Sequence, residues 1–269
     1  MKHFLFLFLL TAMSFVSYGQ LKDSVLFKAS YIYANQGEDK NPGFLPKDSL
    51  VVEIGKRFSI CYSEWERLAE LYVEDEFKKQ LQTQKGQLKL DMTTFSLPKF
   101  GMTQRLYKLF NQNKIVVTDR ILKDKFIYED SLDLFKWQIL SDTATISGYK
   151  CQRATTFFRG RHYDAWFSDQ IPIQNGPLKF GNLPGLIVQV NDSDRLFYFR
   201  LTSFEKVSQI AEIELNQNGF IKTERKKFME LRKAMFQNPQ AFLGGQGATF
   251  QYKSDVPLAS KKYIPMELE

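Results

Sequence analysis

Short segments rich in aromatic and β-branched residues recur from about residue 25 to residue 202, and turn-forming residues separate them. Aromatic residues make up 15% of the chain, and such side chains favour strands. Short strands with regularly spaced turns are typical of an antiparallel sheet. We therefore expect a mainly β (α+β) fold, a curved antiparallel sheet or half-open β-barrel with two helices. The expected strands cover residues 25–33, 50–54, 58–62, 106–110, 114–122, 125–128, 135–140, 150–158, 161–167, 186–190 and 196–202.

Gly55 interrupts the alternating pattern between 50–54 and 58–62, and we interpret it as a bulge within one continuous strand. A helix is expected to follow, because Ser63 and Glu66 have the spacing of a capping box. Its apolar residues recur at helical intervals, which we interpret as packing against the core. These residues are Trp65, Leu68, Tyr72, Phe77 and Leu81.

A second helix is expected from about Thr223 to Gln237, ending before Pro239. Phe228, Leu231 and Met235 mark its apolar side, and lysines and arginines cover the opposite side. Such a basic face could rest on an anionic membrane surface. It could equally be the solvated side of an ordinary surface helix.

The N-terminus has the three parts of a secretory signal peptide: a short positive start, an apolar run and small residues before a cleavage point. We expect residues 1–19 to be the signal and cleavage to fall between Gly19 and Gln20. A buried N-terminal strand or a membrane anchor is the alternative. Residues 20–243 would form one β-rich domain, and residues 244–269 a loosely ordered tail. The protein would be periplasmic or secreted, without a lipid anchor, because no cysteine follows the apolar run.

The whole chain carries 37 Lys and Arg against 30 Asp and Glu, a net charge of +7. This mild excess does not indicate a nucleic-acid partner, and an anionic lipid surface is the better match outside the cytoplasm. In an oxidising compartment Cys61 and Cys151, the two cysteines, could form a disulfide. The alternative is two buried thiols on different strands.

Most catalytic signatures are missing from the sequence, including the nucleophile elbow, the paired-histidine zinc motif and the phosphate loop. Once the signal is removed, His162 is the single histidine, which excludes zinc sites built from several histidines. Arg161, His162, Asp164 and Trp166 could form a small polar and aromatic site on one strand. They could also be a solvated strand face. An enzymatic role is therefore less favoured, and we expect neither a cofactor nor a metal.

A stretch rich in proline and glycine follows Trp166 and ends in an apolar run. Pro184-Gly185 predicts a type II turn, in which the glycine would adopt a positive φ. The apolar residues after it predict a buried strand. The residues that we single out as a binding motif are Trp166, Pro172, Gly176, Pro177, Asn182, Leu183, Pro184, Gly185, Leu186 and Ile187.

This stretch resembles the GLPGLI family of exported bacterial proteins, whose six-residue motif reads Asn-Leu-Pro-Gly-Leu-Ile here, at Asn182 to Ile187. The spaced elements upstream are also similar to the family's, from Gly148 onward. Asn182 replaces the first glycine of the motif, and asparagine tolerates a left-handed backbone well. The resemblance implies export and a general layout. It implies no reaction, because the family's activity is unassigned.

An aromatic-rich curved sheet offers a concave apolar surface, where ligands commonly bind. Our leading hypothesis is a non-enzymatic binding or assembly factor of the cell envelope. Its partner would be an apolar ligand, a lipid-modified protein or an outer-membrane protein. One alternative is an envelope hydrolase that uses a carboxylate and His162. Another is a structural adaptor that recognises a second protein through the Pro/Gly-rich loop.

Overall fold

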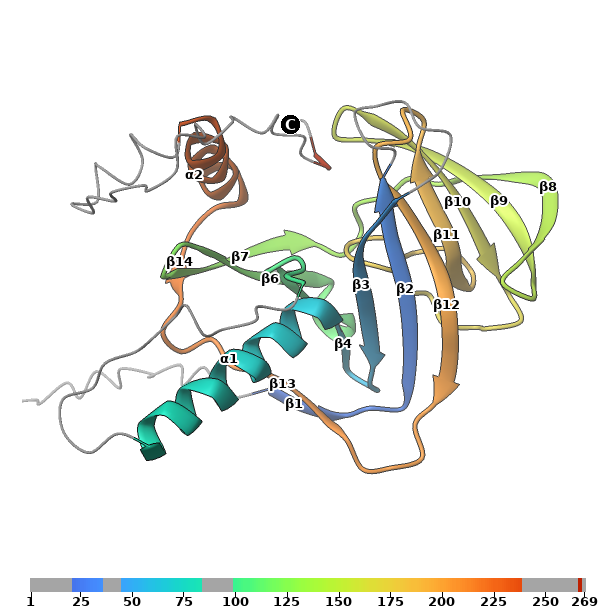
Figure 1. The fold of residues 1–269 in the computed structure, drawn as a ribbon. Helices are drawn as coiled ribbons and strands as arrows, with labels where there is room; N and C mark the ends of the chain where they lie inside the picture. Colours follow the sequence, from blue (N-terminus) through green and yellow to red (C-terminus); the bar gives the residue numbers. More distant parts are fainter. Residues whose placement is uncertain (1–20, 36–44, 84–98, 239–265, 268–269) are drawn as a thin grey trace, which may run out of the picture.

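A computed structural model gives the fold, and we describe the residues drawn in colour in Figure 1. The expected signal peptide and its cleavage point at Gly19 and Gln20 lie outside them, as does most of the expected tail. Neither helix in the described part of the chain is long and apolar enough to cross a membrane. The described residues are 21–35, 45–83, 99–238 and 266–267.

One large sheet dominates the molecule, and it is built from two consecutive meanders. The first meander comprises β2 (Phe27–Asn35), β3 (Leu45–Ile54), β4 (Phe58–Ser63), β5 (Arg105–Leu109), β6 (Lys114–Ile121) and β7 (Asp124–Ser131). The second comprises β8 (Gln138–Ile146), β9 (Tyr149–Phe158), β10 (Arg161–Ser168), β11 (Leu186–Asp192) and β12 (Tyr198–Lys206).

Antiparallel pairing of β12 with β2 joins the two meanders into one sheet. The short strand β14 (Ile221–Lys222) adds to β7 in parallel, so the sheet has twelve strands and two free edges, at β14 and β8. Figure 1 shows the sheet bending strongly between β2 and β7 without closing into a barrel. The expected fold, a curved antiparallel sheet with two helices, is confirmed.

A separate two-stranded sheet pairs β1 (Leu21–Ser24) with β13 (Glu212–Leu215). Side chains of this small sheet, such as Ile213 and Leu215, form a second core cluster with residues of β4 to β7 such as Phe58. The sequence pattern did not predict β1, β13 or β14. These strands have four residues or fewer, too few for an alternating pattern to stand out.

The predicted bulge at Gly55 is wrong, because residues 55–57 turn the chain from β3 into the antiparallel strand β4. The N–H of Gly55 donates to the carbonyl oxygen of Phe58 at 2.9 Å and closes the turn. Asp23 holds it from outside, since its Oδ2 accepts hydrogen bonds from the N–H groups of Arg57 and Phe58. A Cβ at position 55 would lie 2.5 Å from that carboxylate oxygen, so the glycine is needed for space.

Helix α1 (Glu64–Thr83) begins where the sequence predicts, with the Ser63 hydroxyl accepting from the N–H of Glu66 at 2.9 Å. The interpretation of its apolar stripe as core packing is wrong. Leu68, Phe77 and Leu81 are 38–48% exposed. The first turns of α1 pack on β3 and β4, and Glu66 and Glu70 form ion pairs with Arg120 of β6 and Arg105 of β5, whereas the rest of the helix extends away from the sheet (Figure 1).

Helix α2 (Arg225–Gln237) lies beside β7. Its Phe228 is fully buried, with its ring centroid 5.6 Å from that of Phe126 and 5.5 Å from that of Tyr128. Burying such a ring contributes about 1.5–3 kcal/mol, so this one residue fixes the helix on the sheet. Two basic residues of the helix face protein carboxylates: Arg225 pairs with Glu267, and Arg232 pairs with Asp119.

Candidate functional site

The loop between β10 and β11, residues 169–185, lies inside the bend of the sheet and is largely buried. Its Leu178, Phe180 and Leu183 belong to the main core cluster. The Phe180 ring lies 5.1 Å from the Phe135 ring and 5.0 Å from the Tyr163 ring, measured between centroids. The loop therefore fills the concave face with the chain's own side chains.

Lys108, on β5 of the first meander, forms three hydrogen bonds to this loop. Its Nζ donates to the Oδ1 of Asn175 at 2.8 Å and to the carbonyl oxygens of Gly176 at 2.9 Å and Phe180 at 2.5 Å. The Asn175 amide nitrogen donates onward to the Ser59 hydroxyl at 2.9 Å. Burial lowers the pKa of Lys108 to about 7. Nothing in the sequence distinguished this lysine from the other cations.

The expected left-handed backbone at Asn182 is present, with φ at 65°. Its side-chain amide also donates to the carbonyl oxygen of Leu132 at 2.9 Å. The predicted type II turn is wrong, because the N–H of Gly185 donates to the carbonyl oxygen of Leu183, two residues back, and Gly185 is not left-handed. The glycine is needed for a different reason: a Cβ there would lie 2.1 Å from the Ser168 carbonyl oxygen.

The remaining motif residues are mostly structural. Leu186 and Ile187 open β11 and are completely buried. The N–H of Leu186 donates to the carbonyl oxygen of Ile171, beside Pro172, at 2.9 Å. Gly176 lies against Ile187, where a Cβ would come within 3.0 Å of that side chain. Buried within the same loop, Pro177 accepts a hydrogen bond at its carbonyl oxygen from the Phe180 N–H.

The proposed cluster of Arg161, His162, Asp164 and Trp166 does not form one site. Arg161 is buried and faces Asp192, with 3.4 Å between Nη1 and Oδ2. The other three residues alternate with buried ones, so they lie on the opposite face of β10. The strand's two-residue period separates the arginine from its expected partners.

On that outer face, Asp164 is bound by Arg153, whose Nε and Nη2 both donate to its Oδ1, at 2.9 and 2.6 Å. The His162 ring packs against the Phe157 ring at an interplanar angle of 56°, with 4.7 Å between ring centroids. The Phe157 ring is 61% exposed. The face is therefore a mixed aromatic and polar surface, not a cleft with converging carboxylates.

The disulfide considered for Cys61 and Cys151 is absent, since both cysteines are free and buried. Cys61 lies on β4 and Cys151 on β9, and five strands separate these two in the sheet. The Cys61 sulfur accepts from the N–H of Leu178 at 3.3 Å. Burial raises the pKa of Cys61 to about 11 and also raises the pKa of Cys151, so both are unreactive thiols of the core.

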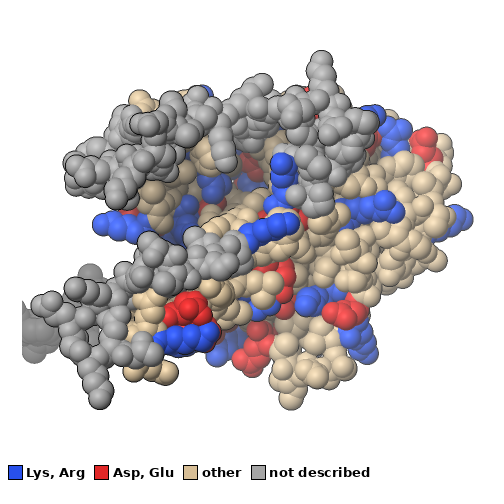
Figure 2. Space-filling model, viewed as in Figure 1, with Lys and Arg blue, Asp and Glu red and all other residues tan. Residues whose placement is uncertain are grey.

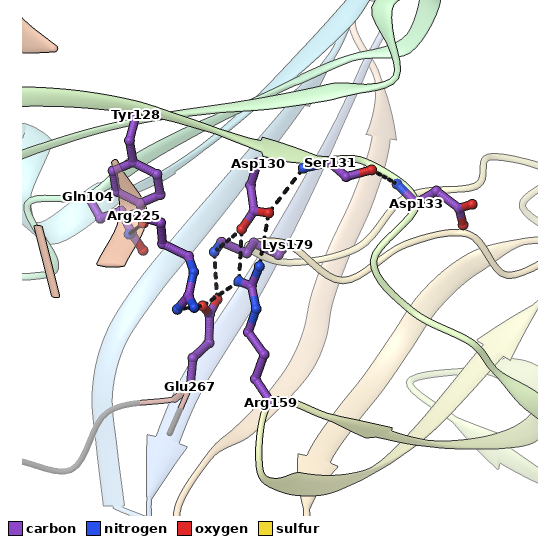
Figure 3. A network of polar contacts seen from close by, with 9 residues as sticks. All are labelled: Gln104, Tyr128, Asp130, Ser131, Asp133, Arg159, Lys179, Arg225 and Glu267. Atoms are coloured by element: carbon purple, nitrogen blue, oxygen red, sulfur yellow. Dashed lines mark hydrogen bonds and ion pairs between the residues drawn. The ribbon is translucent and has the colours of Figure 1, made fainter. Parts of the chain in front are cut away.

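Figure 3 shows a network of charged residues to which β7, the β9–β10 turn, the loop and α2 each contribute a side chain. Asp130, at the end of β7, receives Arg159 from the β9–β10 turn at 2.8 Å and Lys179 from the loop at 3.0 Å. Burial alone would raise the pKa of Asp130. The hydrogen bonds and charges of Arg159 and Lys179 outweigh burial and lower that pKa to about 2.

Glu267 completes the network from a distant part of the chain. Its carboxylate pairs with Arg159 at 2.6 Å, Lys179 at 2.6 Å and Arg225 at 3.0 Å. The side chains of Lys179 and Glu267 are each only 8% exposed. This residue belongs to the tail expected to be loosely ordered, and no sequence signal separated it from neighbouring acidic residues.

Basic and acidic side chains elsewhere are mixed over the face of the molecule shown in Figure 2, without a large area of one sign. Among the described residues, no group of three or more histidine, cysteine or acidic side chains could hold a metal ion. The network of Figure 3 joins five charged side chains: Asp130, Arg159, Lys179, Arg225 and Glu267.

A family model described as "N-glycanase peptide, N-terminal domain" matches residues 78–226, more than half of the chain. This chain belongs to that family. The match runs from within α1 to the start of α2, and it includes the loop and the cations of the network. Glu267 lies outside the matched residues. No curated protein matches the chain.

Two solved structures of PNGF-II resemble the chain. The one in space group P21 has a TM-score of 0.50 at 12% identity, over 77% of this chain and 32% of that chain. The one in space group C2 has a TM-score of 0.49 at 13% identity, over the same shares. The chain thus spans about a third of the length of PNGF-II, and the likeness is one of fold. MucB, solved in complex with MucA(peri), has a TM-score of 0.31 at 8% identity, over 70% of this chain and 52% of that chain.

Proposed function

We propose that the chain is a non-enzymatic binding module of an exported, GLPGLI-type cell-envelope protein, and that it recognises a protein partner. The observation that carries this proposal is the filled concave face. Loop 169–185 occupies the inside of the bend, and Lys108 fastens it with three hydrogen bonds. A face that is already packed supports surface recognition better than enclosure of a ligand.

The hypothesis that the protein binds an apolar ligand loses support for the same reason. A lipid chain inside the bend would have to displace Phe180 and Leu183, which are almost fully buried among other core side chains. Each buried apolar side chain contributes about 1.5–3 kcal/mol. An incoming lipid chain would bury little more apolar surface than the side chains that it displaced. We therefore favour a protein partner over a lipid.

The hydrolase hypothesis also has little geometric support. Asp164 is held by Arg153, and the His162 ring packs at a tilt against Phe157, both on the outer face of the sheet. General acid–base catalysis needs a titratable group within reach of a bound substrate. An open strand face offers no enclosure that would position one.

Native mass spectrometry of protein purified from the envelope tests the proposal. A retained partner of protein mass is the expected result. A retained species of a few hundred daltons would favour the apolar-ligand hypothesis instead. Turnover of an envelope substrate, lost in an Asp164→Asn variant, would favour the hydrolase.

A second candidate function is recognition of a glycan-bearing peptide, which the family's description as an N-glycanase domain suggests. The exposed Phe157 ring next to His162 is the observation that favours it. Exposed rings beside polar groups such as Asp164 offer both a flat apolar surface and hydrogen-bond partners. The surface faces away from the filled side of the sheet.

Calorimetric titration with an N-glycopeptide and with its deglycosylated form tests this candidate. Binding of the glycosylated form alone, lost in Phe157→Ala, would support it. Ile210→Ala is a matched control, because Ile210 is a fully exposed apolar residue on another segment. Equal binding of both peptide forms would count against it.

A further inference from the structure

Three cations from separate parts of the fold converge on one carboxylate. Arg159 comes from the β9–β10 turn, where its φ is 43°, Lys179 comes from the loop, and Arg225 from the first turn of α2. We call these three residues the carboxylate pocket. Their nitrogens lie 2.6, 2.6 and 3.0 Å from the carboxylate oxygens of Glu267 (Figure 3).

The charge balance shows why the carboxylate pocket requires an anion. Asp130 is the other carboxylate in the network, and it faces Arg159 and Lys179. With Asp130 alone, one negative charge faces three positive ones, and a second carboxylate reduces the excess from +2 to +1. Unpaired charges in a desolvated site cost several kcal/mol, so the geometry favours binding of a carboxylate.

The pocket also recognises the backbone next to that carboxylate. The Tyr163 hydroxyl donates to the carbonyl oxygen of Met266 at 2.7 Å. The Met266 side chain packs, partly buried, against the core cluster. An apolar residue followed by an acidic one is thus held at three points: its side chain, its carbonyl and the carboxylate.

The carboxylate and the pocket belong to different parts of the chain. Arg159, Lys179, Arg225 and Asp130 all lie within the residues that the family model matches, and Glu267 does not. Glu267 is 42 positions from Arg225 and 108 from Arg159. The domain therefore supplies the receptor, and a segment outside the matched region supplies the ligand.

We propose that the carboxylate pocket is a binding site for a short segment of a partner protein that presents a carboxylate side chain, with Met266 and Glu267 occupying it as a tethered competitor. This inference rests on the proposed function as a protein-binding module, and it names the chemistry of the partner. The recognised segment carries an apolar residue and then Glu or Asp. Binding exchanges one carboxylate for another, and no covalent step is involved.

Competition by a tethered segment sets the size of the expected effect. A competing segment on the same chain acts at an effective concentration of about 1 mM. A free peptide with a Kd of about 10 µM for the vacated pocket would then bind the native chain about 100-fold more weakly. The fold-change should fall at high salt because the contact is between opposite charges.

Fluorescence anisotropy with a labelled peptide of residues 263–269 provides the test. The full-length Glu267→Gln chain should bind this peptide about 100-fold more tightly than the native chain does. The same peptide carrying Glu267→Gln should not bind. Adding Lys179→Met to the Glu267→Gln chain should abolish binding, whereas adding Lys226→Ala, an exposed lysine of α2, should leave it unchanged. Equal and weak binding to both chains would overturn the inference.

Hydrogen exchange of the native chain covers the case in which Glu267→Gln does not fold. Excess peptide should increase exchange at Met266 and Glu267 as they leave the pocket, and the Gln-substituted peptide should not. No increase at saturating peptide would overturn the inference. If native mass spectrometry finds a protein partner that Lys179→Met also retains, the proposed function stands and only this inference fails.

Discussion

The ammonium group of Lys108 lies under the Pro/Gly-rich loop and donates to the Oδ1 of Asn175, 2.8 Å away. The lysine comes from the first meander and the asparagine from the second, so this contact ties the two halves of the sheet together. Both residues are buried. The loop's conformation therefore depends on a residue 67 positions earlier in the chain.

Replacing Lys108 should destabilise the fold. Lys108→Met keeps the apolar stem but removes all three hydrogen bonds and leaves the carbonyl oxygens of Gly176 and Phe180 without this donor. Each unsatisfied buried acceptor costs about 1–3 kcal/mol, so we expect the free energy of unfolding at pH 7 to fall by about 3 kcal/mol. Urea denaturation measures it. Lys125→Met, on the exposed side of β7, should change it by less than about 0.5 kcal/mol.

The same lysine should make stability depend on pH. Its pKa is lowered to about 7 in the folded chain by burial and returns to about 10.5 on unfolding, so the unfolded state binds more protons between these values. Stability should therefore rise from about pH 7 to pH 10, by at most about 1.4 kcal/mol per unit. The difference in slope between the native chain and Lys108→Met isolates this contribution. Parallel curves would contradict the assignment.

Asp130→Asn should destabilise the fold at neutral pH, and the difference from the native chain should shrink in acid. The carboxylate's pKa of about 2 lies below the unfolded value near 3.8, so its contribution is full above the unfolded pKa and is lost as pH falls toward 2. Removing one partner of a buried ion network costs about 3–5 kcal/mol. We expect that loss at pH 7 and a much smaller one at pH 2. Asp133→Asn, an exposed neighbour, is the matched control.

Gly185→Ala should be strongly destabilising, because the new Cβ would lie 2.1 Å from the backbone oxygen of Ser168. Backbone must move to relieve this contact, and we expect a loss of about 3 kcal/mol or more. Gly181→Ala is the matched control within the same loop, since its Cβ would meet nothing closer than 3.5 Å. Thermal melting compares the two. Equal melting temperatures would show that the loop yields easily at position 185.

Thiol counting should find two free cysteines without any reductant, because Cys61 and Cys151 are unpaired. Their burial predicts slow labelling in the folded protein and complete labelling of both in denaturant. Mass spectrometry after alkylation measures the number of modified thiols. A protein two daltons lighter that resists alkylation until it is reduced would indicate a bridge.

The pattern of aromatic and β-branched residues was enough to predict the fold class and a strand near each one in the two meanders, although β8 lies at Gln138–Ile146 and not at 135–140. The local pattern failed where contacts with distant parts of the chain decide the structure. Gly55 looks like an interruption in one strand, but Asp23, far away in sequence, stabilises a turn there. The stripe on α1 has a helical period, yet Phe77 and Leu81 remain exposed because the helix extends past the sheet.

The candidate site was less predictable from sequence than the fold. Arg161 and His162 were grouped by proximity, whereas the period of the strand sends them to opposite faces. Lys108, Lys179 and Glu267 lack any motif, and only the fold brings charged residues at such separations into contact. The motif around Asn182 was identified for its backbone, and its left-handed φ agrees with that interpretation.

Because the loop belongs to one meander and Lys108 to the other, the loop cannot reach its anchored position until β12 has paired with β2. That pairing joins segments about 170 residues apart, and loop closure over such a distance is slow. We therefore expect docking of the Pro/Gly-rich loop to be among the last steps of folding. Until then, the aromatic inner surface of each half would be open to solvent, and this is when a newly made chain would be most prone to aggregate.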